Sequence, residues 1–217
     1  MKLLCLCCGS VRPQSEDWVN LDMLLPILGR WSEEWKQIQS ETNYREFDVE
    51  SGPLPFKEGE FDGVLFAHAL EHFDCKVGVG IMAECRRILK PQGVLVVSVP
   101  DASYFRKVHE EDTVENAERL FGEPIHLPDG ETTFFGYGLW NRYHKSILTE
   151  DAVWAYFRRA GFSDKMVLRL NKEWLGATTS YVSHPLVVSR IDHGALDTMV
   201  SKLNRLPFSL VMCGVKE

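Results

Sequence analysis

At 217 residues, with 45% apolar and 25% charged residues, the sequence is long enough for one globular domain with a sizeable core. Its net charge of −7 argues against a non-specific nucleic-acid surface or an anionic-membrane surface. No apolar run approaches the roughly 18 residues of a membrane-spanning helix. Most of the six cysteines fall in apolar patterns, where a free thiol acts as a small hydrophobic group. With no secretion signal, we expect a reduced, cytoplasmic protein.

The N-terminal stretch predicts a buried strand and a glycine turn. Residues 3–8 are a short run of leucine and cysteine that stops at Gly9, and a second apolar piece then ends at Asp22. This order is typical of a site for a ribose-bearing cofactor, because glycine lets the backbone approach the ligand and a carboxylate binds the ribose hydroxyls. A buried strand followed by a surface acid accounts for the pattern equally well.

This turn differs from a dinucleotide-binding fingerprint. That fingerprint needs three spaced glycines, and only Gly9 is present. Asp22 follows Gly9 by 13 positions (22 − 9), fewer than the roughly 20 of a dinucleotide site. The turn therefore suits a nucleoside without a pyrophosphate, and a nicotinamide oxidoreductase is disfavoured. Cys5, Cys7 and Cys8 have no matching Cys or His pair at zinc spacing, so we expect no metal site.

Further along the chain, patterns of strands and helices alternate, which predicts a parallel α/β sheet. Helices are expected at residues 32–39, 75–90 and 149–160, and strands at residues 44–49, 61–68, 94–99, 165–170 and 207–215. Residues 102–148 have no clean period, so we expect them to form a lid or substrate loop within a single domain. Its aromatic residues could line an acceptor pocket or form a small core of their own, and they include Tyr104, Phe105, Phe134, Phe135, Tyr137, Trp140 and Tyr143.

The order of these motifs resembles the class I S-adenosylmethionine-dependent methyltransferases, especially small predicted methyltransferases with a Gly-Cys-Gly type first motif. Here the first motif reads LCLCCG (residues 4–9) and then WVNLD (residues 18–22), and the strongest match covers residues 61–73 and 84–101. His144, the AGF at residues 160–162 and the terminal FSLVMCGVK continue the pattern over most of the chain. The resemblance implies a Rossmann-like, mostly parallel, doubly wound sheet with an antiparallel last strand and helices on both faces.

The resemblance also implies the cofactor, S-adenosyl-L-methionine, and the residues that bind it. These residues are Cys7, Cys8, Gly9, Asp22, Asp48, Ala67 and His68. Gly9 and its neighbours would pass beneath the methionine part, Asp22 would bind the ribose and Asp48 would approach the adenine amino group. Ala67 and His68 would line the methionine side. All are expected at strand ends and βα turns, where open α/β sheets bind ligands, although each acid could instead cap or solvate a loop.

Two features depart from the family pattern. Cys7 replaces the first glycine of the motif, and a side chain at that position crowds the turn. The segment between Gly9 and Asp22 leaves little room for a first crossover helix, since a parallel connection usually needs a dozen residues or more. We therefore expect an open or weak site, or one that a partner completes. A homodimer is a separate expectation.

Methyl transfer is an in-line displacement at a sulfonium carbon, for which a protein supplies proximity, orientation and exclusion of water. A hydroxyl acceptor also needs a base, and histidine is suited to that near neutral pH. The candidate bases are His72 and, second, His144, although His72 could equally be a structural histidine at a helix start. We expect O-methylation of a small-molecule or glycan-type acceptor, with no nucleic-acid or membrane partner. The alternative is a catalytically degenerate domain of this fold that binds a partner.

Overall fold

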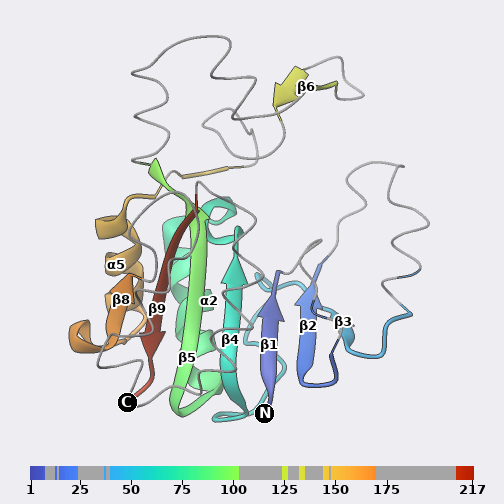
Figure 1. Ribbon diagram of the computed structural model, residues 1–217, viewed down its shortest axis with the longest axis vertical. Coiled ribbons are helices and arrows are strands. Elements are labelled where there is room, and N and C mark those ends of the chain that lie inside the picture. The colour runs from blue at the N-terminus through green and yellow to red at the C-terminus, as the bar shows by residue number, and fades with distance from the viewer. Residues whose placement is uncertain are drawn as a thin grey trace.

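The structure, a computed structural model, describes residues 1–7, 13, 15–23, 37, 40–102, 124–126, 132–134, 144–146, 148–169 and 209–217. Its main element is a seven-stranded sheet with the order β3-β2-β1-β4-β5-β9-β8 (Figure 1). The strands are β1 (Leu3–Leu6), β2 (Trp18–Asp22), β3 (Tyr44–Glu46), β4 (Phe61–Ala67), β5 (Leu89–Pro100), β8 (Val167–Arg169) and β9 (Ser209–Val215). The pairs from β3 through β5 are parallel, whereas β9 is antiparallel to both β5 and β8. The predicted parallel sheet with an antiparallel last strand is thus confirmed.

The three central strands are buried on both faces. All four residues of β1 are fully buried, and so are Val64 to Phe66 in β4 and Leu95 to Val97 in β5. A strand covered on both sides has no polar face, so its sequence is a continuous apolar run rather than an alternating one. This explains why these strands could be located from the sequence.

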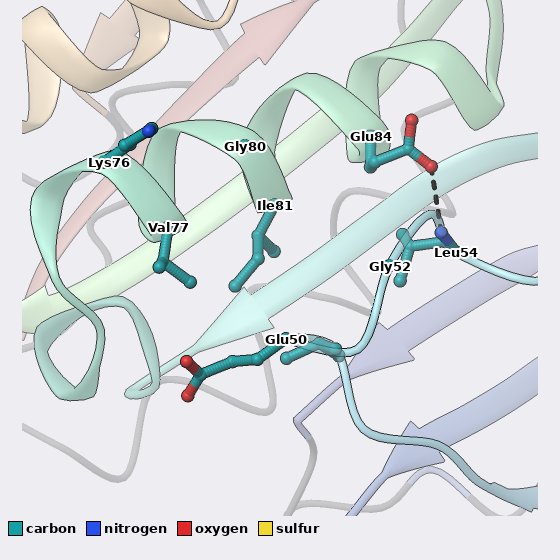
Figure 2. Close-up of a pocket in the computed structure, with 9 residues that line it drawn as sticks. Glu50, Gly52, Leu54, Lys76, Val77, Gly80, Ile81 and Glu84 are labelled. Carbon is teal, nitrogen blue, oxygen red and sulfur yellow. Dashed lines mark hydrogen bonds between the residues drawn. The ribbon is translucent and has the colours of Figure 1, made fainter.

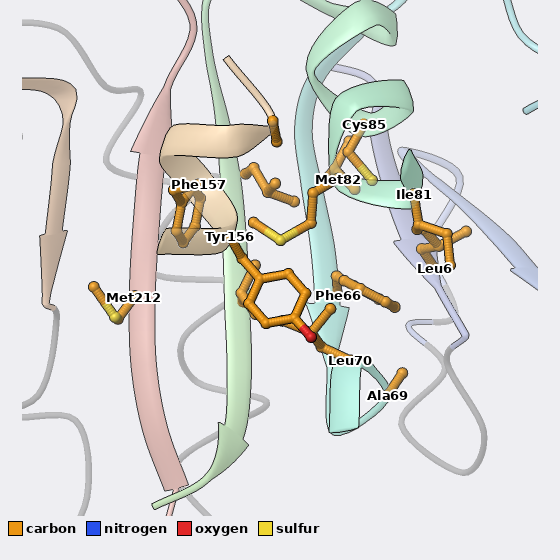
Figure 3. Packing of buried hydrophobic residues seen from close by; sticks show 14 of the residues in the cluster. Leu6, Phe66, Ala69, Leu70, Ile81, Met82, Cys85, Tyr156, Phe157 and Met212 are labelled. Atoms are coloured by element: carbon orange, nitrogen blue, oxygen red, sulfur yellow. The ribbon is translucent and has the colours of Figure 1, made fainter. Parts of the chain in front are cut away.

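Two helices pack on one face of the sheet. Helix α2 (Cys75–Ile88) buries Ile81, Met82, Cys85 and Ile88, and it contacts helix α5 (Glu150–Arg159), which buries Val153, Tyr156 and Phe157. Figure 3 shows side chains of both helices in one apolar cluster with strand residues such as Phe66 and Met212. Helix α5 is capped at both ends: Thr149 Oγ1 accepts a hydrogen bond from the Ala152 amide at 3.2 Å, and Gly161, which follows the helix, has a φ of 90°.

Some predicted boundaries were wrong. Helix α2 ends at Ile88 and not at Lys90, because Leu89 is already extended and pairs with Phe61 as the first residue of β5. Strand β3 ends at Glu46 because the chain turns at Asp48. The predicted strand at residues 165–170 is divided between a 3₁₀ turn, η3 (Asp164–Met166), and β8. The helix predicted at residues 32–39 lies outside the described residues except for Gln37.

The register of the parallel strands brings their carboxyl ends to one edge of the sheet. Leu6 pairs with Leu21 on one side and Phe66 on the other, and Phe66 pairs with Val97. Because β9 runs the opposite way, it begins at this same edge with Ser209. Within the predicted insertion, β6 (Pro124–His126) and β7 (Thr132–Phe134) form a separate antiparallel pair. Among the helices that the structure describes, none has the length and apolar character needed to cross a membrane.

Candidate cofactor and acceptor site

The backbone turns sharply at the ends of the two central strands β1 and β4. Cys7, directly after β1, has a φ of 52°, and His68, directly after β4, has a φ of 49°. Residues with a side chain rarely adopt this left-handed conformation, and such strain is often found at functional sites. Each turn is held by a backbone hydrogen bond of 2.8 Å, from the Cys7 amide to Leu21 and from the His68 amide to Ser98. The residue that the sequence marks as a replaced glycine therefore has a conformation that favours glycine.

Asp22 is the last residue of β2, next to β1 in the sheet, and it is partly exposed. Its carbonyl oxygen accepts hydrogen bonds from the Tyr44 hydroxyl and from the Phe47 amide, both at 3.0 Å. The chain after β3 is therefore fastened to the end of β2. This places Asp22 at the strand end where the sequence predicts a ribose ligand.

Asp48 lies two residues beyond β3 and starts a turn. Its Oδ1 accepts the Glu50 amide at 2.9 Å, and its carbonyl accepts the Ser51 amide at 3.0 Å and the Ser51 hydroxyl at 2.6 Å. These bonds are those of a loop-capping aspartate, the alternative left open for this residue. The adenine role of Asp48 stays a prediction.

A groove lies between the loop after Asp48 and helix α2 (Figure 2). It has a volume of about 450 Å³, and its lining residues include Val49, Glu50, Leu54, Val77 and Ile81. Glu84 of α2 closes one end, because its Oε2 accepts the Leu54 amide at 2.9 Å. The groove thus begins one residue after Asp48 and has a largely apolar wall.

Four titratable side chains cluster beyond the end of β4, and the structure thereby brings both candidate bases together. Glu71 and His72 belong to the 3₁₀ turn η2 (Leu70–His72), His68 precedes it, and His144 comes from the far end of the insertion. The rings of His72 and His144 are 4.6 Å apart between centroids and meet edge to face. Glu71 Oε1 lies 3.7 Å from His68 Nδ1 and 4.0 Å from His144 Nε2.

Burial sets the charge of this cluster. It raises the pKa of Glu71 to about 8. Burial, with the nearby charges of His144 and His72, lowers the pKa of His68 to about 3. Burial, with the charge of His72, lowers the pKa of His144 to about 4. Near neutral pH, His68 and His144 are therefore neutral imidazoles, each of which keeps a nitrogen lone pair that can accept a proton or bind a cation.

Backbone hydrogen bonds fix the position of His144. The amides of Lys145 and Ser146 both donate to the carbonyl oxygen of Glu71, at 2.8 and 3.2 Å. Leu148 then forms an isolated parallel β-bridge with Asp101, and the Ala102 amide donates a hydrogen bond to the Leu148 carbonyl at 3.2 Å. Both ends of the predicted insertion at residues 102–148 therefore lie at the carboxyl edge of the sheet.

Three further polar residues of this edge were missed by the sequence reasoning. Buried Asp101, at the end of β5, pairs with Arg169 at 3.3 Å, and Arg169 also pairs with Glu150 at 2.7 Å. Ser209 Oγ lies 2.6 Å from His68 Nε2, within hydrogen-bond distance. Asp101 could have been identified as a candidate site residue from the sequence, because an aspartate directly after a buried strand is a local signal. Nothing local in the sequence marks Ser209 or Arg169.

Several predicted site residues lie outside the described residues. These are Cys8 and Gly9 of the first turn and the aromatic residues of the insertion, with the exception of the backbone of Phe134 in β7. The described members Cys7, Ala67 and His68 lie together at the neighbouring ends of β1 and β4. Asp22 ends the adjacent strand, and Asp48 lies beyond the edge strand β3.

Comparisons with known proteins agree with this geometry. Residues 12–97 match the family model of the methyltransferase domain. A SAM-dependent methyltransferase from Archaeoglobus fulgidus is similar in structure, with 14% identity, coverage of 99% of this chain and 86% of that chain, and a TM-score of 0.54. A Thermotoga maritima protein described as a possible histamine N-methyltransferase gives 17% identity, coverage of 100% and 82%, and a TM-score of 0.52. The YcgJ protein from Bacillus subtilis gives 14% identity, coverage of 100% and 92%, and a TM-score of 0.51.

Comparison with curated protein sequences finds no match. At such low identities the structural likeness shows the fold, and the family model adds the domain type. Residues 12–97 thus match the methyltransferase-domain family, and the chain as a whole shares the fold of solved SAM-dependent methyltransferases.

Proposed function

We propose that this protein transfers a methyl group from S-adenosyl-L-methionine to a hydroxyl of a small-molecule or glycan-type acceptor. The observation that supports this most is the arrangement at the carboxyl edge of the sheet, where Asp22, Cys7 and His68 end or follow three adjacent parallel strands. Open α/β sheets bind their ligands at this edge. A cluster of histidines lies directly beyond it.

The residues at this edge fit the cofactor. Asp22 is partly exposed at its strand end, as a ribose ligand has to be, and the left-handed turns at Cys7 and His68 bend the chain away from the strands. Ala67 and His68 would line the methionine side, Cys8 and Gly9 would complete the first turn, and Asp48 would approach the adenine. The cofactor supplies the electrophilic methyl group when it is bound. The protein holds the acceptor in line and excludes water.

The candidate base for a hydroxyl acceptor is His72, with His144 second. His72 ranks first because η2 places it just beyond Ala67 and His68, on the proposed methionine side. His144 comes from the end of the insertion and contacts the ring of His72. Either imidazole could take the hydroxyl proton as the oxygen attacks the methyl carbon.

We further propose that residues 102–148 form the lid over the acceptor within a single domain. Both ends of this segment leave the sheet at the carboxyl edge, at Asp101 and Leu148. A cytoplasmic location is supported by the described cysteines Cys75, Cys85 and Cys213, whose thiols form no disulfide.

One observation favours the alternative, a domain of this fold that binds a partner without catalysis. Cys7 keeps a side chain in a conformation that favours glycine, at the turn where the cofactor would pass. A side chain there would crowd the methionine part. A second copy in a homodimer could complete such an open site.

A transfer assay tests the proposal against this alternative. The protein is incubated with methyl-labelled S-adenosyl-L-methionine and a panel of hydroxylated small molecules and glycans, and transfer of the label is measured. We expect transfer to at least one acceptor, and His72→Gln should lower kcat while cofactor affinity stays unchanged. Cofactor binding without transfer to any acceptor would favour the binding-domain alternative. Transfer only to amines or thiols would contradict the hydroxyl acceptor.

A further inference from the structure

The carboxylate of Glu71 is buried and lacks an expected partner. The side chain is 1% exposed, and neither of its oxygens has a hydrogen-bond partner among the residues that the structure describes. The nearest imidazole nitrogens, His68 Nδ1 and His144 Nε2, lie 3.7 and 4.0 Å away, which is too far for a hydrogen bond. A buried carboxylate without a donor is costly, so it needs either a proton or a cation.

Two imidazoles face the same space as this carboxylate. One ligand atom each from Glu71, His72 and His144 can be chosen so that all three lie within 4.8 Å of one another. In a tetrahedral zinc site with bonds of about 2.1 Å, the ligand atoms lie roughly 3.4 Å apart. An approach of up to about 1.4 Å between the ligand atoms (4.8 − 3.4) therefore closes the cluster around an ion. Side-chain rotations can supply this movement.

Two chain segments that are hydrogen-bonded to each other carry the three candidate ligand residues. Glu71 and His72 share the turn η2, in which the His72 amide donates to the Ala69 carbonyl at 3.0 Å. The segment after His144 is fastened to the Glu71 carbonyl by the amides of Lys145 and Ser146. The ligand atoms are thus brought together by backbone contacts that do not depend on an ion.

We propose that Glu71, His72 and His144 bind a divalent first-row transition-metal ion, with Zn²⁺ as the reference probe. Two imidazole nitrogens and one carboxylate are a donor set that suits such ions, whereas Mg²⁺ and Ca²⁺ prefer oxygen ligands alone. His68 would contact the Glu71 carboxylate rather than the ion, because its Nδ1 faces Glu71 while its Nε2 lies 2.6 Å from the Ser209 hydroxyl.

This inference adds a metal site to the proposed methyl transfer. It does change how the histidines act when an ion is present. A nitrogen that binds the ion cannot accept a proton with the same lone pair, so the ion would instead lower the pKa of a bound hydroxyl acceptor, whose proton would pass to water. The metal site itself stands whether or not the chain transfers methyl groups.

Metal titration of the untagged, full-length protein tests the proposal. After treatment with a chelator, the protein is titrated with Zn²⁺ against a chromophoric competitor and with Co²⁺ under visible absorption. We expect one ion per chain with micromolar or tighter affinity. The Co²⁺ complex should show ligand-field bands without a sulfur charge-transfer band, which excludes the cysteines as ligands. Glu71→Gln and His144→Ala should each weaken binding at least about tenfold.

The matched control is Glu58→Gln, because Glu58 is an exposed carboxylate before β4, at the opposite edge of the sheet from Glu71. It should bind Zn²⁺ as the unchanged protein does. Less than about one-tenth of an ion per chain, or binding that all three variants retain, would overturn the proposal and leave Glu71 as a buried, protonated acid.

Two further readouts keep the test decisive. Zn²⁺ should raise the Tm of the unchanged protein and of Glu58→Gln but not of Glu71→Gln, which shows by its own transition that it is folded. S-adenosylhomocysteine binding is measured in the same samples. If the protein binds S-adenosylhomocysteine but not Zn²⁺, only the metal site is refuted. If it binds Zn²⁺ but not S-adenosylhomocysteine, only the proposed function is refuted.

Discussion

Two glycines of helix α2 differ in the space around them, so substitution by alanine should have opposite effects on stability at the two positions. A Cβ built on Gly78 would lie 2.8 Å from Leu70 Cδ1 and 2.9 Å from Tyr156 Cε1. Both neighbours are buried, so neither can swing into solvent (Figure 3). A Cβ built on Gly80 would meet nothing within 4 Å. Gly78→Ala therefore tests the packing of α2 against η2 and α5, and Gly80→Ala is its matched control.

The magnitudes follow from two terms. Replacing glycine by alanine inside a helix stabilises it by about 1 kcal/mol, because the unfolded chain has less freedom to lose. Gly80→Ala should show this gain. At Gly78, overpacking of a filled core costs roughly 1–3 kcal/mol and outweighs the gain. We expect Gly78→Ala to lower the free energy of unfolding by about 1 kcal/mol, some 2 kcal/mol below Gly80→Ala.

Urea unfolding monitored by circular dichroism measures this difference, with thermal unfolding as a second readout. A difference of about 2 kcal/mol corresponds to roughly 4–8 °C in Tm for a domain of this size. The m-values should be equal, since the compactness of neither state changes. If Gly78→Ala is as stable as Gly80→Ala, then Leu70 and Tyr156 do not pack against Gly78 and the described core is refuted.

Two other predictions concern the first turn and the loop before β4. Because Cys7 has a φ of 52°, Cys7→Gly should be more stable than Cys7→Ala by about 1 kcal/mol in urea unfolding. The Arg87 hydrogen bond, partly opposed by burial, holds the pKa of Glu84 below its ordinary value. The unfolded chain then binds more protons in acid, so this stabilisation is complete above a pH of about 4.3 and is lost as pH falls through the folded pKa. Glu84→Gln should be less stable by about 1 kcal/mol at pH 7, and this difference should shrink as the pH falls through the folded pKa of Glu84.

The predictions for Cys7 and Glu84 can each be contradicted by one result. Equal stability of the two Cys7 variants would mean that this turn is not left-handed in solution. A stability gap for Glu84→Gln that is the same at pH 7 and pH 3 would mean that ionisation of this carboxyl does not hold the loop at Leu54.

The parts of the fold that could be predicted are those whose sequence pattern is local. The buried strand β1 and residues 94–100 of β5 are almost continuous apolar runs, and the order of the strands implied which ends meet at the ligand edge. Asp22 at the end of β2 and His68 directly after β4 therefore lie where the sequence predicted them. The end of α2 was harder, because Lys90 continues its basic last turn while Leu89 already pairs with Phe61. A local pattern does not show this competition between helix and strand.

The site beyond β4 depends on contacts between distant residues. His144 meets Glu71 because the amides that follow it bond to the Glu71 carbonyl, and no sequence spacing records this. Ser209 reaches His68 only because β9 is antiparallel and therefore begins at the ligand edge. The burial of Glu71 without a hydrogen-bond donor can be seen only in the folded chain, and no sequence pattern predicts it.

The central claim, a cofactor site at the carboxyl edge, is tested most directly by calorimetric titration with S-adenosylhomocysteine. Asp22 is the last residue of β2, at the carboxyl edge of the sheet, whereas Asp17 directly precedes β2 at the opposite edge. Asp17→Ala is therefore the matched control for Asp22→Ala. We predict micromolar binding that Asp22→Ala abolishes and Asp17→Ala keeps. Absence of binding at millimolar ligand, or equal binding by both variants, would contradict the site.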